Sequence, residues 1–204
     1  MPVKPRVEFH FDFGSPNAYL SHRLIPAITE RTGVPFIYIP VLLGGVFKLT
    51  NNQPPMVQFK GIKNKAEYAR LETARFIKRH GLTAFKPNPH FPVNTIQIMR
   101  GAVLAERDGF FEPYVEAVFR AMWEEGRKMD DPQVIKATLT NAGIDADAVL
   151  EGISEQSIKD KLVADTAASV DRGNFGSPTF FVDDEMYFGK DRLDDVERAI
   201  GKMG

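Results

Sequence analysis

The sequence predicts an α/β protein whose small sheet is built from both ends of the chain and is interrupted by a large α-helical insertion. Residues 7–13 and 36–41 have strand patterns and are joined by a helical segment. From Val46 onward the patterns are helical or irregular, and strand patterns return only at residues 179–188. The expected domains are a discontinuous sheet domain, residues 1–45 and 173–204, and a helical insertion domain, residues 46–172.

The composition restricts the possible functions. Of the 204 residues, 43% are hydrophobic and 26% are charged, as in ordinary globular proteins, and no stretch approaches the ~18 apolar residues of a membrane span. The net charge is −1, so the chain offers no basic field for a nucleic-acid backbone. We therefore expect neither nucleic acid nor membrane as a partner. The N-terminus lacks the apolar middle of a signal peptide, which predicts a cytoplasmic location.

The chain contains no cysteine. Disulfides, thiolate metal sites and a thiol nucleophile of the protein's own are therefore excluded, and so is a disulfide oxidoreductase. Any sulfur chemistry must use a thiol that a ligand supplies.

The first predicted strand, Val7–Phe13, alternates strictly between apolar and polar side chains. Glu8, His10 and Asp12 share one face, which we expect to be polar. The second strand, Phe36–Val41, follows a helix, so the two strands are expected to be parallel with a right-handed crossover.

Gly14-Ser15-Pro16 ends the first strand and opens the helix. Serine is a preferred N-cap, and proline suits the first helical position because its missing N–H needs no partner there. Pro26 is expected to kink this helix and Gly33 to end it. Ser15 is thereby placed where a hydroxyl and the positive end of a helix can both stabilise an anion.

Ser177-Pro178 leads into the third strand. A proline costs a ladder hydrogen bond unless it stands at the start of a strand, so Pro178 is expected there. A cis bond before Pro178 turns the Ser177 backbone outward, where its N–H and C=O can pair with an extended ligand. A tight turn without a binding role is the alternative.

A hairpin and a helix are predicted to end the chain. Thr179–Val182 and Met186–Phe188 flank a turn in which we expect a positive φ, and hence a glycine, at the position that Asp184 occupies. The last helix is predicted to begin at Asp191, a natural N-cap.

Three motifs occur in order along almost the whole chain. They are Phe11-Asp-Phe-Gly-Ser-Pro-Asn-Ala-Tyr19, then His90-Phe-Pro-Val-Asn-Thr95 with Arg100, then Gly173-Asn-Phe-Gly-Ser-Pro-Thr-Phe-Phe-Val182 followed by Phe188-Gly-Lys-Asp-Arg192. Together they resemble the 2-hydroxychromene-2-carboxylate isomerases and the related kappa-class glutathione transferases. The resemblance implies a thioredoxin-like fold with a large α-helical insertion, as in DsbA-like proteins.

The resemblance also implies glutathione as the cofactor. Ser15 matches the family's catalytic serine and is expected to hydrogen-bond the glutathione sulfur. Ser177, which precedes Pro178, is expected to pair through its backbone with the cysteinyl unit. The family is dimeric, which implies a homodimer here.

Four further residues match glutathione contacts of the family. They are Asn52, one of the lysines Lys60 and Lys65, and the pair Lys190 and Asp191 near the γ-glutamyl amine. From residue types alone each has a simpler alternative. Ser15 and Asp191 can be plain helix caps, Asn52 a turn residue, and the lysines a solvated face.

The implied activity is a glutathione-dependent interconversion of 2-hydroxychromene-2-carboxylate and trans-o-hydroxybenzylidenepyruvate, a step of aromatic hydrocarbon catabolism. It runs through thiolate addition, bond rotation and elimination. The alternatives are a kappa-like glutathione transferase, which shares these residues, and a non-catalytic thioredoxin-fold protein that binds peptides along the Pro178 edge. Aromatic residues that could line a small-molecule aromatic substrate, or simply belong to the core, are Phe47, Phe85, Phe91 and Trp123.

Overall fold

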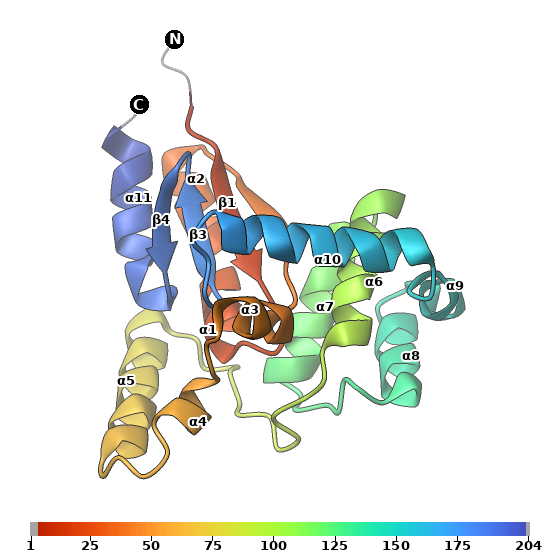
Figure 1. Ribbon diagram of the computed structural model, residues 1–204, viewed down its shortest axis with the longest axis horizontal. Helices are drawn as coiled ribbons and strands as arrows, with labels where there is room; N and C mark the ends of the chain where they lie inside the picture. Colours follow the sequence, from red (N-terminus) through yellow and green to blue (C-terminus); the bar gives the residue numbers. More distant parts are fainter. Residues whose placement is uncertain (1–3, 203–204) are drawn as a thin grey trace.

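Four strands form one mixed sheet in the order β2-β1-β3-β4 in the computed structural model, which describes residues 4–202 (Figure 1). The strands are β1 Val7–Phe11, β2 Phe36–Pro40, β3 Thr179–Val182 and β4 Glu185–Phe188. β1 pairs parallel with β2 and antiparallel with β3, and β3 pairs antiparallel with β4. The two ends of the chain therefore meet in the centre of the sheet. Residues 1–3, which belong to the N-terminal stretch used in the signal-peptide prediction, lie outside the described range.

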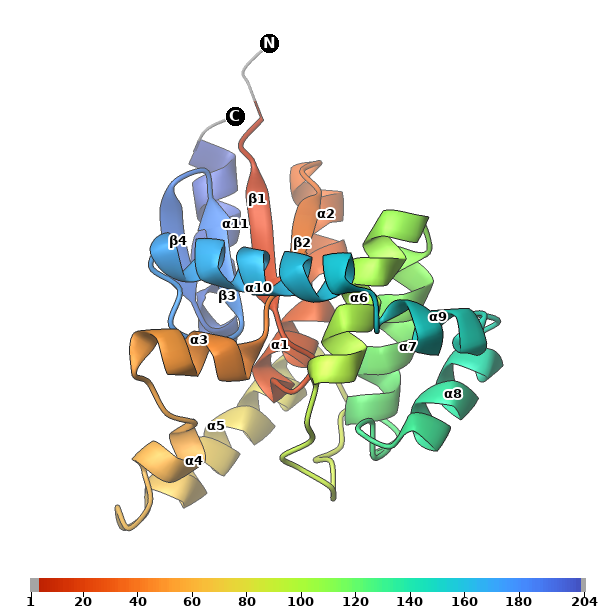
Figure 2. The same ribbon diagram turned by 45° about the vertical axis from the view of Figure 1, so that its right-hand side comes forward.

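Helices make up the remaining regular structure. They are α1 Pro16–His22, α2 Ile25–Thr32, α3 Leu43–Thr50, α4 Pro55–Gln58, α5 Lys65–His80, α6 Ile96–Asp108, α7 Phe111–Trp123, α8 Pro132–Asn141, α9 Ala146–Gly152, α10 Gln156–Asp171, the 3-10 turn η1 Lys190–Arg192 and α11 Leu193–Lys202. α10 crosses in front of the strands in both ribbon views and contacts β2 and α3 (Figures 1 and 2). α11 contacts α2 and β3, and it stands at the left of the molecule beside β4 in Figure 1. None of the described helices has the length and hydrophobicity that a membrane span needs.

The first helix breaks where we expected a kink. α1 ends at His22, and a second helix, α2, begins at Ile25 with Pro26 in its first turn. A proline in a first turn has no intrahelical hydrogen bond to lose, which makes a new start less costly than a kink. Gly33 ends α2 as expected, with a φ of 66°.

The polar face of β1 is buried. Glu8 and His10 are only 4% and 3% exposed. His10 Nδ1 lies 2.8 Å from Ser169 Oγ, and its Nε2 lies 3.0 Å from Glu8 Oε2. Asn174 donates to Ser169 Oγ, so we assign the Ser169 hydroxyl as donor to Nδ1 and His10 as neutral, donating through Nε2 to Glu8.

Charge pairing makes this burial tolerable. Arg172 pairs with Glu8 and places its guanidinium 3.9 Å from the centre of the Phe181 ring. Burial acts to raise the pKa of Glu8, but hydrogen bonds from His10, Arg6 and Arg172 outweigh it and lower the pKa to about 2. Burial lowers the pKa of His10, and Glu8 opposes this only in part.

The β3–β4 turn also differs from expectation. The positive φ, 50°, belongs to Asp183 and not to Asp184. Asp183 tolerates this conformation because its carboxylate accepts a hydrogen bond from the Arg6 N–H at 2.9 Å, while its own N–H donates to the Arg6 carbonyl at 2.8 Å. The turn is thus tied to the chain that precedes β1.

Aromatic rings join the sheet to the helical insertion. The ring centre of Phe119 on α7 lies 5.6 Å from that of Phe11 and 4.7 Å from that of Phe13. α6 and α7 approach closely at Gly101, where an added Cβ would lie 2.0 Å from the Tyr114 hydroxyl. The insertion therefore shares one continuous core with the sheet.

The Glu8 cluster predicts a loss of stability in acid. A carboxylate with a pKa of about 2 in the folded state and 4.5 in the unfolded state contributes stability that is complete above pH 4.5 and is lost as the pH falls toward 2. Arg6 and Arg172 are partly exposed, which weakens the pairing, so we expect the free energy of unfolding to fall by ~1–2 kcal/mol over this range. Urea unfolding of the wild type and of Glu8→Gln measures this. Parallel losses in the two proteins below pH 4.5 would contradict the assignment.

Candidate active site

Ser15 and Ser177 meet although they are 162 residues apart in the chain. The Ser15 hydroxyl donates to the Ser177 carbonyl at 2.8 Å and accepts from the Ala18 N–H at 3.2 Å as the N-cap of α1. The antiparallel pairing of β1 with β3, which sets His10 opposite Thr179, causes this meeting. The side chain of Ser15 therefore both caps α1 and contacts the loop that precedes Pro178.

The Ser177-Pro178 bond is cis. The Ser177 carbonyl is occupied by the Ser15 hydroxyl, and the Ser177 Oγ accepts from the Asp12 N–H at 3.1 Å. Within residues 4–202 the Ser177 N–H has no hydrogen-bond partner. The Ser177 backbone can therefore offer a ligand its open N–H as a donor. Its carbonyl becomes an available acceptor if the Ser15 hydroxyl moves away.

Asn174 holds the loop that carries Ser177, and sequence reasoning missed it. It is 1% exposed, and its Oδ1 accepts from the Gly176 N–H and from the Thr179 hydroxyl, each at 2.8 Å. Its Nδ2 donates to Ser169 Oγ at 2.7 Å. The preference of asparagine for turns was the available signal, since it bonds the backbone two residues on.

Asn52 lies beside the same loop. Its Nδ2 donates to the Phe175 carbonyl at 2.8 Å, and its Oδ1 accepts from the Gln53 N–H at 2.8 Å. Asn51, with a φ of 55°, ends α3 and turns the chain toward this position. Asn52 therefore both shapes its own turn and contacts the loop that carries Ser177.

Within the described part of the chain, Lys190 is linked to the Ser177 loop only through the backbone of its neighbour Gly189. Gly189 donates to the Pro178 carbonyl at 3.0 Å, and η1 packs against α1. Lys190 is 6% exposed, and its Nζ lies 2.7 Å from Asp191 Oδ1 and 4.4 Å from the centre of the Phe76 ring. The predicted capping of the last helix by Asp191 is wrong, because Asp191 lies inside η1 and α11 begins at Leu193. Its carboxylate instead remains largely exposed beside the Lys190 ammonium.

Lys60 and Lys65 are not joined to these residues. Both are exposed on the α4–α5 segment, which projects from the lower left of the molecule in Figure 1. Lys65 Nζ lies 4.7 Å from the centre of the Phe59 ring. Within residues 4–202, neither lysine has a hydrogen bond or an ion pair with Ser15 or Ser177.

Asp12 is a second residue that sequence reasoning missed, because it was predicted only as part of the polar face of the first strand. It is 1% exposed, and its carbonyl accepts from the Ser15 N–H at 3.0 Å. Its Oδ1 accepts from the Gly14 N–H at 2.8 Å, and its Oδ2 accepts from the Leu43 N–H at 2.7 Å and the Thr95 hydroxyl at 3.1 Å. Burial raises the pKa of Asp12, and these three hydrogen bonds oppose the rise.

The helix that Ser15 caps is short. α1 has only seven residues, so it sums few peptide dipoles. The Ser15 hydroxyl and the open Ser177 N–H are further donors beside this helix start.

Exposed aromatic rings near the site differ from those expected. Trp123 is a core residue, 2% exposed, and its Nε1 donates to the Phe13 carbonyl at 2.8 Å. Phe91 is 40% exposed with its ring centre 5.9 Å from that of Trp123, while Phe47 and Phe85 are half-buried. An unexpected exposed pair, Phe175 and Phe188, lies on the Ser177 loop and β4 with ring centres 4.4 Å apart.

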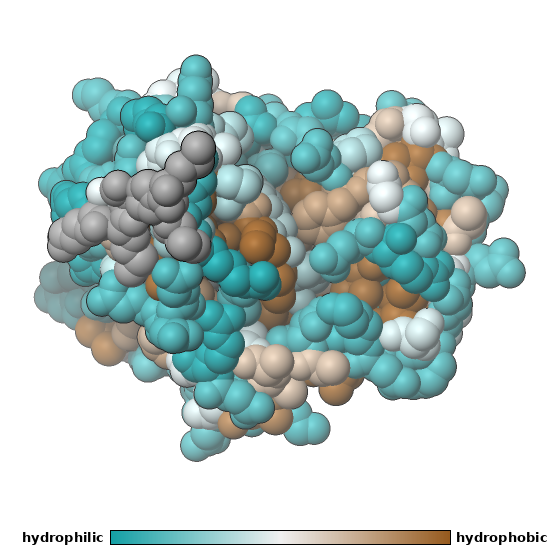
Figure 3. Space-filling model, turned by 90° about the horizontal axis from the view of Figure 1, so that it is seen from above, coloured by the Kyte–Doolittle hydropathy of each residue, from teal (hydrophilic) through white to brown (hydrophobic). Residues whose placement is uncertain are grey.

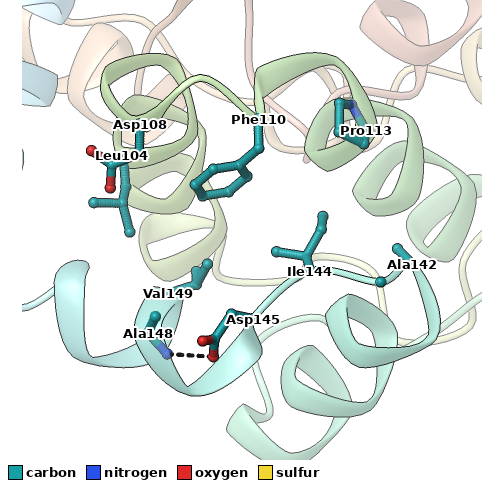
Figure 4. A pocket seen from close by; sticks show the side chains of 10 residues that line it. Leu104, Asp108, Phe110, Pro113, Ala142, Ile144, Asp145, Ala148 and Val149 are labelled. Atoms are coloured by element: carbon teal, nitrogen blue, oxygen red, sulfur yellow. Dashed lines mark hydrogen bonds between the residues drawn. The ribbon is translucent and has the colours of Figure 1, made fainter.

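Two cavities lie away from Ser15. One, of 720 Å³, is lined by the edge strand β2 and by α2 and α7. Seen from above, the molecular surface is hollowed between two lobes, with apolar side chains in the hollow (Figure 3). The other, of 300 Å³, lies between α6 and the α8–α9 loop (Figure 4). Its acidic side chains are already engaged, since Asp145 caps α9 through the Ala148 N–H and Asp108 pairs with Arg107.

Several known proteins are similar to this chain along nearly its whole length. A 2-hydroxychromene-2-carboxylate isomerase of Pseudomonas putida is 27% identical over 197 residues, which cover 97% of this chain and 95% of that protein. Glutathione S-transferase kappa 1 of Rattus norvegicus is 26% identical over 216 residues, covering 99% of this chain and 94% of that protein.

The solved structures that resemble this chain include the same kind of protein. The structure of a 2-hydroxychromene-2-carboxylate isomerase superimposes with a TM-score of 0.80 at 28% identity, covering 97% of this chain and 95% of that one. A probable DsbA oxidoreductase of Streptomyces coelicolor gives a TM-score of 0.74 at 18% identity, which supports the fold alone. The predicted thioredoxin-like fold with a helical insertion is confirmed. The family model of the DsbA-like thioredoxin domain matches residues 6–201, and the chain therefore belongs to that family.

Proposed function

We propose that the protein is a glutathione-dependent isomerase that interconverts 2-hydroxychromene-2-carboxylate and trans-o-hydroxybenzylidenepyruvate. The observation that carries this proposal is the contact of the Ser15 hydroxyl with the Ser177 carbonyl beside an open Ser177 N–H. The names of the full-length relatives favour the isomerase reaction. A cytoplasmic location belongs to the proposal, since reduced thiols persist there.

The polar groups around Ser15 suit glutathione. A γ-linked tripeptide presents a thiol, two carboxylates, an amine and two peptide groups. The hydroxyl of Ser15, the backbone of Ser177 and the amide of Asn52 are neutral partners for the thiol and the peptide groups. Lys190 and Asp191 carry opposite charges side by side, which matches an amine next to a carboxylate. Lys60 or Lys65 reaches the ligand only if the α4–α5 segment moves toward it.

Glutathione, when bound, supplies the thiol that adds to the conjugated double bond of the substrate and leaves it after rotation. The chain's own part is to bind, orient and stabilise charge. The Ser15 hydrogen is held by the Ser177 carbonyl, and it turns to the sulfur when a ligand N–H takes that carbonyl. The exposed rings of Phe175 and Phe188 give an aromatic substrate an apolar face next to Ser177.

A kappa-like glutathione transferase is the second candidate, because kappa-class relatives also match along nearly the whole chain. It would use the same residues and would release a conjugate. A peptide-binding role along the Pro178 edge is a third candidate, and it requires no turnover at all.

Turnover of 2-hydroxychromene-2-carboxylate with and without glutathione tests the proposal. We expect isomerisation only with glutathione, and no net consumption of the thiol, because addition is followed by elimination. Absorbance of the substrate and a thiol assay measure the two quantities. Consumption of one thiol per turnover would identify a transferase instead. Absence of glutathione binding by calorimetry at millimolar concentration would reject both enzymes.

Ser15→Ala separates the chemical role of the hydroxyl from capping. Loss of the cap costs ~1 kcal/mol of stability. Loss of a donor to a charged sulfur costs about 1.5–3 kcal/mol, so we expect turnover by the folded mutant to fall roughly ten- to a hundredfold. Steady-state kinetics corrected for the folded fraction measures this. An unchanged rate would show that Ser15 is only a cap.

A homodimer is also part of the proposal, supported by an apolar patch on the α4–α5 segment. The patch consists of Met56, Val57, Phe59, Ile62, Tyr68 and Leu71, each 37–58% exposed. Exposed apolar residues gathered in one place are typical of an interaction surface.

We expect a dimeric mass at micromolar concentration and a monomeric mass for Ile62→Glu, because a buried unpaired carboxylate destabilises an interface. Light scattering measures both. Val163→Glu is the matched control, since Val163 is 67% exposed on α10 and outside the patch. A monomeric wild type, or equal behaviour of the two variants, would contradict the patch as the interface.

A further inference from the structure

We propose that Asp12 is a positioning residue that holds the Ser15 hydroxyl in the geometry needed to stabilise a bound thiolate. The inference rests on the proposed glutathione site. It assigns to Asp12 a role that acts through Ser15 and does not involve contact with the ligand.

The hydrogen bonds of Asp12 support this role. Asp12 makes five hydrogen bonds, and they reach four separate segments of the chain. Two of them shape the turn before α1, because the Asp12 carbonyl accepts from the Ser15 N–H at 3.0 Å and its Oδ1 accepts from the Gly14 N–H at 2.8 Å. A third, from the Asp12 N–H to Ser177 Oγ at 3.1 Å, ties this turn to the loop before β3.

The other two bonds anchor the turn to the helical insertion. Oδ2 accepts from the Leu43 N–H at the start of α3 and from the Thr95 hydroxyl at the start of α6. The packing is tight at position 14, where an added Cβ would lie 3.0 Å from Thr95 Cγ2 and 3.3 Å from Asp12 Oδ1. The orientation of Ser15 is therefore set jointly by the sheet and by two helices of the insertion.

The bonding also decides which group can face a ligand. The Ser15 N–H, which could otherwise donate to an anion at the helix start, is consumed by the Asp12 carbonyl. Of the two donors of Ser15, the hydroxyl is the one that can turn to a ligand, once the Ser177 carbonyl releases it.

The groups that face the Asp12 carboxylate are neutral. They are the amides of Gly14 and Leu43 and the hydroxyl of Thr95. Within residues 4–202, no lysine, arginine or histidine forms an ion pair with Asp12. The buried Asp12 carboxylate is stabilised by hydrogen bonds alone. Loss of any one of them is costly, because an unpaired polar group is poorly stabilised in the low dielectric of the protein interior.

Asp12→Asn changes this arrangement with little change in shape. An amide has one acceptor oxygen and one NH₂ donor, whereas Gly14 and Leu43 both require an acceptor, on opposite oxygens. One backbone N–H must lose its partner, so the turn before Ser15 relaxes. We expect kcat to fall about tenfold while the glutathione dissociation constant changes less than about threefold, since other residues bind the tripeptide.

The thiol pKa of bound glutathione, followed by thiolate absorbance, distinguishes positioning from a direct charge effect. Removing a nearby negative charge alone would lower the thiol pKa. Losing the Ser15 donor raises it. We expect Asp12→Asn to raise the thiol pKa in the same direction as Ser15→Ala, and a fall in this pKa would overturn the inference.

A double-mutant cycle completes the test. If Asp12 acts through Ser15, the double mutant Asp12→Asn/Ser15→Ala has the kcat and thiol pKa of Ser15→Ala alone. If the two effects multiply, the inference is wrong even though the glutathione site is right. A wild-type protein that binds no glutathione would instead reject the proposed function. Should Asp12→Asn fail to fold, Thr95→Val, which removes one donor and no charge, takes its place in the same cycle with a smaller effect expected.

Discussion

The antiparallel pairing of β1 with β3 is the constraint on which the rest of the structure depends. It sets residues from opposite ends of the chain side by side, so the turn after β1 meets the loop before β3. Every contact of the Ser15 hydroxyl with Ser177 follows from this register. A shift of one residue would turn the buried side chains of β1 to the opposite faces and separate the two serines.

Two buried polar clusters, one along β1 and one just after its end, favour that register. On one face Glu8 and His10 form a network with Arg172 and Ser169, and through Ser169 with Asn174. Asp12 forms the other cluster, at the end of the strand. Buried polar groups are costly when left unpaired, so each cluster favours the single arrangement that satisfies all of its members. Residues 4–202 contain no buried side-chain N or O atom without a partner.

Local signals were enough to predict much of the fold. The cap at Ser15, the helix end at Gly33 and the position of Pro178 before β3 all depend on neighbours within four residues. The same logic failed where the partner is distant. Asp12 is satisfied by Leu43 and Thr95, which are 31 and 83 residues away, and an alternating strand gives no sign that α10 covers its polar face.

The same difference between local signals and distant partners decides which parts of the candidate site could be predicted. The meeting of Ser15 with Ser177 followed from the strand order together with the family resemblance, and the structure contains it. Asn174 was missed because its role comes from the loop that it organises, and the positions of Lys60 and Lys65 could not be predicted because few contacts hold the α4–α5 segment to the sheet.

The most direct test of the account is a crystal structure of the protein with bound glutathione. The account predicts that the sulfur lies within hydrogen-bond distance of Ser15 Oγ, that the Ser177 carbonyl has exchanged the Ser15 hydroxyl for a ligand N–H, and that the Asp12 contacts are unchanged. A sulfur bound elsewhere, with the Ser15 hydroxyl still on the Ser177 carbonyl, would contradict it.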